Sequence, residues 1–488
     1  MKPVKVIKTL FLVFTLLVLP SVDVMAKSYI YGQSNEAVES PDTYTVSKEV
    51  NLIADGVAAV SPQDVFYSAS DKVYVVDTDN NRILIYDNKY EFRGVLSQFM
   101  QIQGDITTLN KPEGIYVDKD ETIYIADTGN HRIIKCDAQG NMILQIEKPD
   151  NLIGVADDSV FNPTKIAVDK SGRIYVVARN YNMGLLQLDE NGRFIGYIGA
   201  PKVQYSLAQM LWRRISTQEQ LSKMEQYVPT EYNNITVDEE GFIYGTIGTL
   251  DADALEKAIQ TRDLSGTVTP VKRLNTSGKD VLKRNGFSAP LGDLEYEEVY
   301  SKIVDVSYTS GGMYALLDVT HGHIFVYESN GNLLCAFGND KFTQCSSFTY
   351  AGDKLLVLDA RLAKLFVYEA TTYGEMVFKA VKVQYNGDFD EAYALWSDVA
   401  AYNYNFEYAF TGLGQTYLYS EQYEQAMECF QRIGDKENYS KAKELLRKEK
   451  MKTAFPVIFI SIIGVVGVAI VYRVTKKIYL YMKDVEES

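Results

Sequence analysis

Histidine is scarce in this sequence of 488 residues, with His131, His321 and His323 as its three copies. His321 and His323 form a His-x-His pair, which on a strand would place two imidazoles on one face and suit a metal ion. A polar turn leading into the apolar run IFVY at 324–327 is the alternative interpretation. The sequence contains no GxSxG, no HExxH and no phosphate-binding glycine loop. We therefore expect no catalytic residue, no metal ligand and no bound cofactor.

A polar turn occurs twice, in VYVVDTDNNRILIYD at 73–87 and in IYIADTGNHRIIKCD at 123–137. In the second copy Asp127 ends one strand, and Arg132 starts the next strand within reach of the Asp127 carboxylate. Gly129 and Asn130 tolerate the positive φ that a tight turn requires. The first copy has Asp77, Asn80 and Arg82 in the same places. Because neither copy adds an acid, base or nucleophile, we interpret the turn as structural.

The elements around these turns form a repeating unit. A second acidic residue follows the first by ten positions in four pairs: Asp77 with Asp87, Asp127 with Asp137, Asp318 with Glu328, and Asp359 with Glu369. Short apolar runs before and inside each pair predict antiparallel strands, and flanking runs bring the unit to four strands. The units lie near 62–99, 112–147, 163–199, 232–276, 301–338 and 345–384. Such a repeat predicts a mainly β fold, a six-bladed β-propeller over 42–384, with 42–54 as a strand that closes the last blade.

Residues 111–140, KPEGIYVDKDETIYIADTGNHRIIKCDAQG, resemble an NHL repeat closely, and residues 71–87 resemble a second, more divergent copy. NHL propellers occur in extracellular sensor domains of bacterial kinases, in amidating lyases, in RNA-binding ubiquitin ligases and in relatives of gluconolactonases, so the fold does not imply one function. The resemblance makes a propeller enzyme of the lyase or lactonase type one hypothesis. Those lyases need several histidine and acidic ligands in the central channel, which three histidines in turn positions do not supply.

Two segments interrupt the predicted propeller. Residues 203–228 carry Leu207, Met210, Leu211 and Ile215 at helical spacing, which predicts an inserted amphipathic helix. This helix either packs over one propeller face or docks a partner or the membrane surface. The irregular insert at 251–296 contains DADALEKAIQTRD, a short helix candidate, followed by VKRLNTSGKDVLKRNGF, whose charges and glycines predict an exposed loop.

Beyond about 385 the pattern changes from strands to helices. Apolar residues recur there with a period of 34, which is the tetratricopeptide period. The segment 386–450 therefore resembles a short tetratricopeptide-like stalk, which is expected to lean on the propeller or on a partner. A spacer above the membrane and a peptide-binding segment are the two interpretations. The packing positions expected in it are Phe389, Ala392, Trp396, Gly414, Tyr417, Tyr423, Ala426 and Phe430.

Both ends of the chain carry membrane-targeting signals. Residues 1–26 read as a signal peptide, because lysines precede an apolar stretch that covers about 16 Å as a helix, too short to span a bilayer. Residues 454–472 are apolar and predict one transmembrane helix. Lysine and arginine flank this span on both sides, so the export signal decides the orientation: bulk outside, and 473–488 as a cytoplasmic tail. The pair of signals fits a bacterial envelope.

The charge balance limits the partners. A formal net charge of -15 without a long basic run argues against nucleic-acid binding. We therefore expect a membrane-anchored, non-catalytic binding or scaffold protein at the cell surface, for a protein, peptide or carbohydrate ligand. An accessory subunit of a transporter or other envelope complex is one such role, and a receptor would need a membrane partner because its tail is short. Calcium held by channel carboxylates and carbonyls stays open.

The cysteines give one structural question. Cys335 and Cys345 are ten residues apart and could pair across a blade junction, or both could be free.

Overall fold

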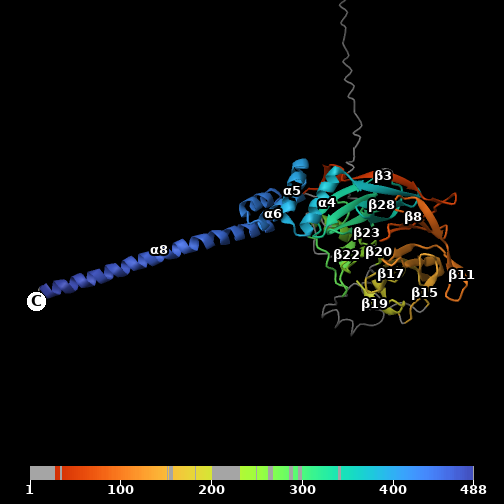
Figure 1. The fold of residues 1–488 in the computed structure, drawn as a ribbon, viewed down its shortest axis with the longest axis horizontal. Coiled ribbons are helices and arrows are strands. Elements are labelled where there is room, and N and C mark those ends of the chain that lie inside the picture. The colour runs from red at the N-terminus through yellow and green to blue at the C-terminus, as the bar shows by residue number, and fades with distance from the viewer. Residues whose placement is uncertain are drawn as a thin grey trace, which may run out of the picture.

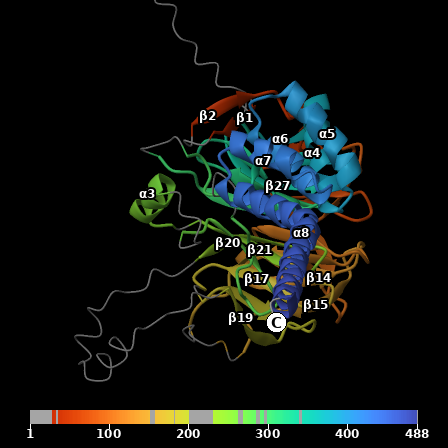
Figure 2. The same ribbon diagram turned by 90° about the vertical axis from the view of Figure 1, so that its left-hand side faces the viewer.

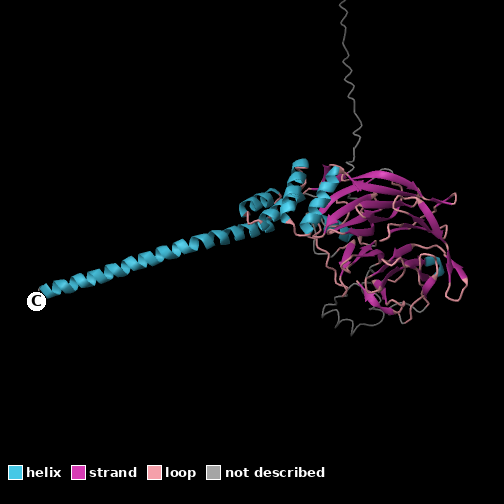
Figure 3. Ribbon diagram, viewed as in Figure 1, coloured by secondary structure: helices cyan, strands magenta, loops and turns pink. Residues whose placement is uncertain are grey.

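The computed structural model shows a β-propeller with helices on one flank and a long helix that leads away from them (Figure 1). Strands form the first part of the chain and helices the last part, with the change at Thr372 (Figure 3). The structure describes residues 28–32, 36–150, 152, 158–181, 183–199, 231–248, 250–261, 268–284, 290–294, 299–338 and 342–486. The signal peptide expected at 1–26 and the helix expected at 203–228 lie outside these residues.

Six blades make up the propeller, which confirms the predicted fold. The first blade consists of β6 (Asp64–Tyr67), β7 (Val73–Asp77), β8 (Arg82–Tyr86) and β9 (Phe92–Leu96). The second consists of β12 (Gly114–Val117), β13 (Ile123–Asp127), β14 (Arg132–Cys136) and β15 (Met142–Ile146). The third consists of β16 (Pro163–Val168), β17 (Ile174–Ala178), β18 (Leu185–Leu188) and β19 (Phe194–Ile198).

The last three blades differ from this regular pattern. The fourth has β20 (Tyr232–Val237), β21 (Ile243–Ile247) and β22 (Val271–Leu274). The fifth has β23 (Ile303–Thr309), β24 (Met313–Asp318), β25 (His323–Glu328) and β26 (Leu333–Gly338), extended by the hairpin β1 (Ser28–Tyr31) and β2 (Ala37–Ser40). The sixth has β27 (Cys345–Ala351), β28 (Lys354–Asp359), β29 (Lys364–Ala370) and β3 (Tyr44–Asn51).

The ring closes between the two ends of the propeller sequence. Strand β3 pairs antiparallel with β29, so the N-terminal segment supplies the outer strand of the last blade, as predicted. The first strands of successive blades, β6, β12, β16, β20, β23 and β27, contact one another in a closed circle around the centre. The short pairs β4 (Ile53–Ala54) with β5 (Val57–Ala58), and β10 (Gln98–Met100) with β11 (Ile106–Thr108), lie in the connections.

The blades are held together by apolar side chains on both faces of each sheet. Strands β7, β13 and β17 are buried at every position, which explains why their sequences are continuous apolar runs rather than alternating ones. One core cluster, for example, joins Tyr74 and Ile83 of the first blade to Ile125 and Ile134 of the second. Each blade therefore depends on its neighbours, and damage to one turn is felt by the ring.

The insert at 251–296 and the N-terminus depart from the sequence interpretation. The short helix expected there is α3 (Ala252–Thr261). The following segment, expected as an exposed loop, instead begins with strand β22, because Val271 and Leu274 are fully buried while the charged residues between them stay partly exposed. Hairpin β1–β2 was not foreseen, since the propeller was expected to start at 42.

Helices begin earlier than expected. The segment after Ala370 is helix α4 (Thr372–Tyr385) and not part of a strand, because the Thr371 side chain caps the helix by accepting from the Gly374 amide and β3 already completes the sheet. The remaining helices are α5 (Phe389–Tyr402), α6 (Glu407–Tyr419), α7 (Tyr423–Arg432) and α8 (Lys436–Glu486).

Helices α4 to α6 belong to the same core as the propeller. One cluster contains Phe337 and Tyr368 from the blades together with Val377 from α4 and Trp396 from α5. At the junction, a Cβ on Gly374 would lie 2.1 Å from the Thr43 carbonyl oxygen, so the α4 backbone touches the backbone before β3. The helical segment thus packs against the blades, which is one of the two placements expected from the sequence (Figure 2).

The tetratricopeptide-like positions lie where the helices meet. Ala392, Trp396, Ala426 and Phe430 are fully buried. Glycines of α6 make room for the two large rings, because a Cβ on Gly412 would lie 2.5 Å from Trp396 and one on Gly414 would lie 2.5 Å from Phe430. Phe389 stacks on Tyr419 and Tyr417 packs against Tyr393, while Tyr423 starts α7 half-buried.

Helix α8 combines the end of the stalk and the apolar span. It runs without a break for 51 residues, and the part from Lys436 to Met482 is long and apolar enough to cross a membrane, with none of its apolar window buried. The last helix of the predicted stalk, the predicted span and the residues after it are therefore successive parts of one helix.

The four cysteines are free in the structure. Cys335 and Cys345 both lie buried in the cluster shared by the fifth and sixth blades, and no disulfide joins them.

Candidate functional site

The repeated turn forms hydrogen bonds to the segment that leads into the first strand of its own blade. This first strand lies nearest the centre of the ring and is called the inner strand. The buried Asp127 carboxylate accepts the Asn110 backbone N–H at 2.8 Å, the Asn130 amide at 2.9 Å and the Arg132 Nε at 2.8 Å. Asn110 lies in the segment that leads into β12. The turn therefore fixes the position at which the inner strand of the second blade begins.

The other three turns repeat this contact. Asp77 accepts from the backbone of Val60, Asp318 from Lys302 and Asp359 from Thr343, at 2.7 to 2.8 Å, and each of these amides precedes an inner strand. In the first blade Asn80 and Arg82 also donate to Asp77. Asp359 pairs in register with Lys364, and Asp318 with His323.

One detail of the turn interpretation was wrong. The left-handed conformation falls on His131, with φ of 57°, and on Asn81, with φ of 55°, and not on Gly129 or Asn130. Gly129 is required for a different reason, because a Cβ there would lie 2.6 Å from the Asn110 carbonyl oxygen. Close packing of the turn on the entry segment, rather than backbone conformation, explains this glycine.

Four polar residues from four blades meet in the central channel. Lys165 of β16 forms an ion pair with Asp64 of β6, with 2.6 Å between Nζ and Oδ1. The Ser347 hydroxyl of β27 lies 3.0 Å from Asp64 and 2.7 Å from Asp305 of β23. Asp305 also accepts the Phe348 backbone N–H at 2.9 Å. The network ties opposite sides of the ring together.

Burial raises the pKa of Asp305 to about 7, and the nearby Asp64 carboxylate adds to this effect, while Lys165 opposes it. Two carboxylates thus share one lysine in a narrow channel. A group with this pKa has the proton affinity of a general base, but Asp305 is buried and its oxygens are held by hydrogen bonds.

Above this network the channel opens into a funnel of about 690 Å³, which we call the channel mouth. Residues at or near the starts of all six inner strands line it, among them Gln63, Glu113, Lys165, Asn233, Lys302 and Ser346. The carboxylates of Asp77, Asp127, Asp318 and Asp359 accept hydrogen bonds from the segments that precede four of these strands. The four turns therefore position residues of the mouth.

The channel mouth has a mixed polar and apolar lining and carries both signs of charge. Arg179 pairs with Glu113 at 2.6 Å, and the Arg179 side chain remains 56% exposed. Lys302 and Glu231 are exposed at the rim. The Thr164 hydroxyl and the Asn233 amide also line the mouth, where they bond to the Val177 carbonyl and to Ile303 and Thr246. Among the described lining residues there is no histidine, so the mouth offers binding groups and no His-based acid–base pair.

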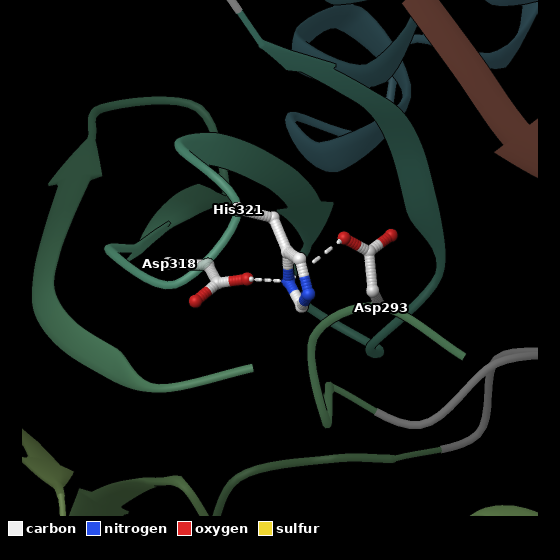
Figure 4. Close-up of side chains that lie close together, drawn as sticks. All are labelled: Asp293, Asp318 and His321. Atoms are coloured by element: carbon white, nitrogen blue, oxygen red, sulfur yellow. Dashed lines mark hydrogen bonds and ion pairs between the residues drawn. The ribbon is translucent and has the colours of Figure 1, made fainter. Parts of the chain in front are cut away.

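A second polar cluster lies at the turn of the fifth blade, where the sequence showed only a His-x-His pair (Figure 4). His321 Nδ1 lies 2.8 Å from Asp318 Oδ2 and 3.5 Å from Asp293 Oδ2. His323 Nδ1 lies 2.6 Å from the same Asp293 oxygen. No repeat pattern in the sequence points to Asp293, because it lies in the insert, 25 positions before Asp318.

The carboxylate of Asp293 is also held by the N-terminal hairpin. The hydroxyls of Tyr29 and Tyr31 both donate to its Oδ1. Burial alone would raise the pKa of Asp293, but hydrogen bonds from His323 and the two tyrosines outweigh burial and hold this pKa below its ordinary value. The cluster therefore connects three parts of the chain that are distant in sequence.

Fold and sites together define a six-bladed propeller with a polar channel mouth, a helical flank and one helix able to span a membrane. A family model described as the NHL repeat matches residues 109–136, the segment that contains β12 to β14. No curated protein sequence matches the chain.

Solved structures give more distant likenesses. Virginiamycin B lyase from Staphylococcus aureus is 11% identical with a TM-score of 0.41, over 67% of this chain and 99% of the lyase. A gluconolactonase from Xanthomonas campestris is 12% identical with a TM-score of 0.40, over 68% and 95%. The allergen Mala s 1 from Malassezia sympodialis is 14% identical with a TM-score of 0.42, over 67% and 97%. Values this low carry no inference about ligand or activity.

Proposed function

We propose that the chain is a single-pass membrane protein whose propeller lies outside the cytoplasm and binds a protein, peptide or carbohydrate at the channel mouth without catalysis. The observation that carries this proposal is the funnel of about 690 Å³, to which all six blades contribute polar residues. Its volume falls within the range of about 300–1,000 Å³ that is typical of ligand sites. Its lining suits a polar or charged ligand, because side chains of both charge signs are exposed there.

The helical flank leaves this face free. Tyr385 at the end of α4 reaches Glu240, and Gly311 and Gly312 lie against Lys382 and Tyr385, all at the turns on the opposite end of the blades. The turns at Asp77, Asp127, Asp318 and Asp359 fix the segments that lead into four of the inner strands. The residues that line the mouth are therefore held in place without a ligand. A preformed site that no described helix covers suits recognition of a partner.

Membrane anchorage rests on α8, and exposure outside the cytoplasm rests on the export signal expected at the N-terminus. An accessory subunit of a transporter or other envelope complex is a role compatible with this arrangement. The enzyme alternative, of the lyase or lactonase type, needs an accessible acid or base. Asp305, whose pKa of about 7 would suit that task, is buried and its carboxylate oxygens are hydrogen-bonded.

Quantitative co-purification from detergent-solubilised membranes tests the proposal. The double variant Arg179→Glu with Lys302→Glu reverses two exposed charges at the mouth. Because it also breaks the Arg179–Glu113 ion pair, the melting temperatures of all three chains are compared beside the recovery. The matched control, Lys89→Glu with Lys119→Glu, makes the same charge change at turns on the opposite end of the blades. We expect the mouth variant to lose the partners that the wild type and the control retain. Equal recovery with all three chains would refute binding at the mouth.

A further inference from the structure

The turn of the fifth blade differs from its counterparts in a specific way. In the second blade Asn130 and Arg132 stand three and five positions after Asp127, and both donate to its carboxylate. In the fifth blade His321 and His323 stand three and five positions after Asp318. The strand register is the same, since Asp318 pairs with His323 as Asp127 pairs with Arg132. Two imidazoles thus replace an amide and a permanently charged guanidinium.

The same turn also gains a second carboxylate, from Asp293. Both carboxylates are buried, with Asp293 3% and Asp318 0% exposed. Among the described residues no lysine or arginine side chain bonds to either of them; their partners are imidazoles, hydroxyls and backbone amides. Two buried carboxylates without a lysine or arginine partner favour a bound cation, and a metal ion or a protonated imidazole could supply that charge.

The separations suit a small divalent cation. Ligand atoms of Asp293, Asp318 and His321 all lie within 4.8 Å of one another. Two ligand atoms at about 2.0–2.1 Å from a tetrahedral zinc ion lie about 3.3 Å apart. The observed 2.8 Å and 3.5 Å from His321 Nδ1 to the two carboxylates bracket that value.

The donor types narrow the choice of metal. Calcium and magnesium prefer oxygen ligands alone, whereas an imidazole combined with carboxylates suits zinc and related transition metals. Outer hydrogen bonds already orient the ligands: His323 lies 2.6 Å from Asp293, and the Ser301 hydroxyl donates to Asp318 at 2.6 Å. Such supporting contacts are typical of protein metal sites.

We propose that Asp293, Asp318 and His321 supply three ligands to one zinc-class divalent transition-metal ion, which stabilises this part of the fold. The ion neutralises the two carboxylates and joins the connection from the fourth blade to the turn of the fifth. Through Tyr29 and Tyr31, which donate to Asp293, it also holds the N-terminal hairpin on that blade. This site lies apart from the channel mouth and does not depend on the function proposed for the mouth.

Metal analysis of the full-length chain tests the site. The protein is purified in detergent without a polyhistidine tag, stripped with a chelator and titrated with zinc in competition with a fluorescent indicator. We expect one zinc per chain and a higher melting temperature with zinc than without it. Asp293→Asn and His321→Asn should each weaken zinc binding at least tenfold. His131→Asn, at the corresponding turn of the second blade but outside the cluster, should bind zinc like the wild type.

A second variant covers the case in which single changes unfold the blade. His321→Asn with His323→Arg recreates the Asn130 and Arg132 chemistry of the second blade and supplies a permanent cation. This chain should fold, bind no zinc at the turn and melt at a temperature that does not respond to zinc. Two results would overturn the proposal: no stoichiometric zinc in the wild type, or a wild-type response to zinc in this double variant. The first result would mean that protons on the two imidazoles balance the carboxylates, and the second that zinc binds elsewhere on the chain.

Discussion

Replacing Asp127 by alanine tests whether the repeated turn holds the fold. The carboxylate is fully buried and accepts three hydrogen bonds, one of them from Arg132, which is itself only 7% exposed. Removing one partner of a buried ion pair costs about 3–5 kcal/mol, because the remaining charge is left uncompensated. At roughly 2 °C per kcal/mol for a large domain, the melting temperature should fall by about 6–10 °C.

The assay is thermal and urea unfolding of the full chain in detergent, followed by circular dichroism. Asp120→Ala is the matched control, because Asp120 is exposed in the same blade, and it should change stability by less than about 0.5 kcal/mol. The double variant Asp127→Ala with Arg132→Met should lose less than the sum of the single variants, since it leaves no unpaired charge. The reasoning is wrong if Asp127→Ala is as stable as Asp120→Ala, or if it keeps its stability but loses partner binding.

Three further predictions concern the channel, the junction and the topology. Asp305→Asn should remove a pH dependence: the folded pKa of about 7 lies above the unfolded value near 3.8, so the wild type loses stability as pH rises from about 4 to about 7, by on the order of 4 kcal/mol. Parallel urea-unfolding profiles for the two chains across this range would contradict the buried carboxyl. Gly374→Ala should lower stability by about 1–3 kcal/mol and expose the α4 junction to limited proteolysis, because the new Cβ meets the Thr43 carbonyl oxygen, whereas Gly196→Ala, which meets no atom within 4 Å, should not. Unchanged proteolysis of Gly374→Ala would refute the close contact. Protease added to intact cells, or to protoplasts, should digest the propeller and leave a fragment containing α8; full protection would contradict export.

The propeller could be predicted because its repeats carry the same local pattern. Apolar runs are separated by turns that begin with an aspartate, and this pattern recurs at the spacing of a blade. Both features depend only on residues that are close in sequence. The strand β3, which closes the ring, could also be predicted from the sequence, because the two ends of a propeller must pair with each other. The helix α4 was missed because its residues follow a strand directly, and only the capping contact of Thr371 with Gly374 shows where the change occurs.

The sites were less accessible to sequence reasoning. Asp127 and Arg132 are neighbours across one turn, but the contact of Asp127 with Asn110 spans 17 positions and appears only in the folded blade. Asp293 joins His321 and Asp318 from an insert that no repeat aligns. The channel mouth collects residues from all six blades, so no local motif marks it.

Photo-crosslinking in intact cells tests binding at the channel mouth most directly. A photoreactive residue is placed at Glu231, which is exposed at the rim of the mouth, and at Lys119, which is exposed at a turn on the opposite end of the blades. The account predicts a discrete adduct, detected as a mass shift, from position 231 and none from position 119. It also predicts that Arg179→Glu with Lys302→Glu removes this adduct. No adduct from position 231, or equal adducts from both positions, would contradict the channel mouth as the binding site.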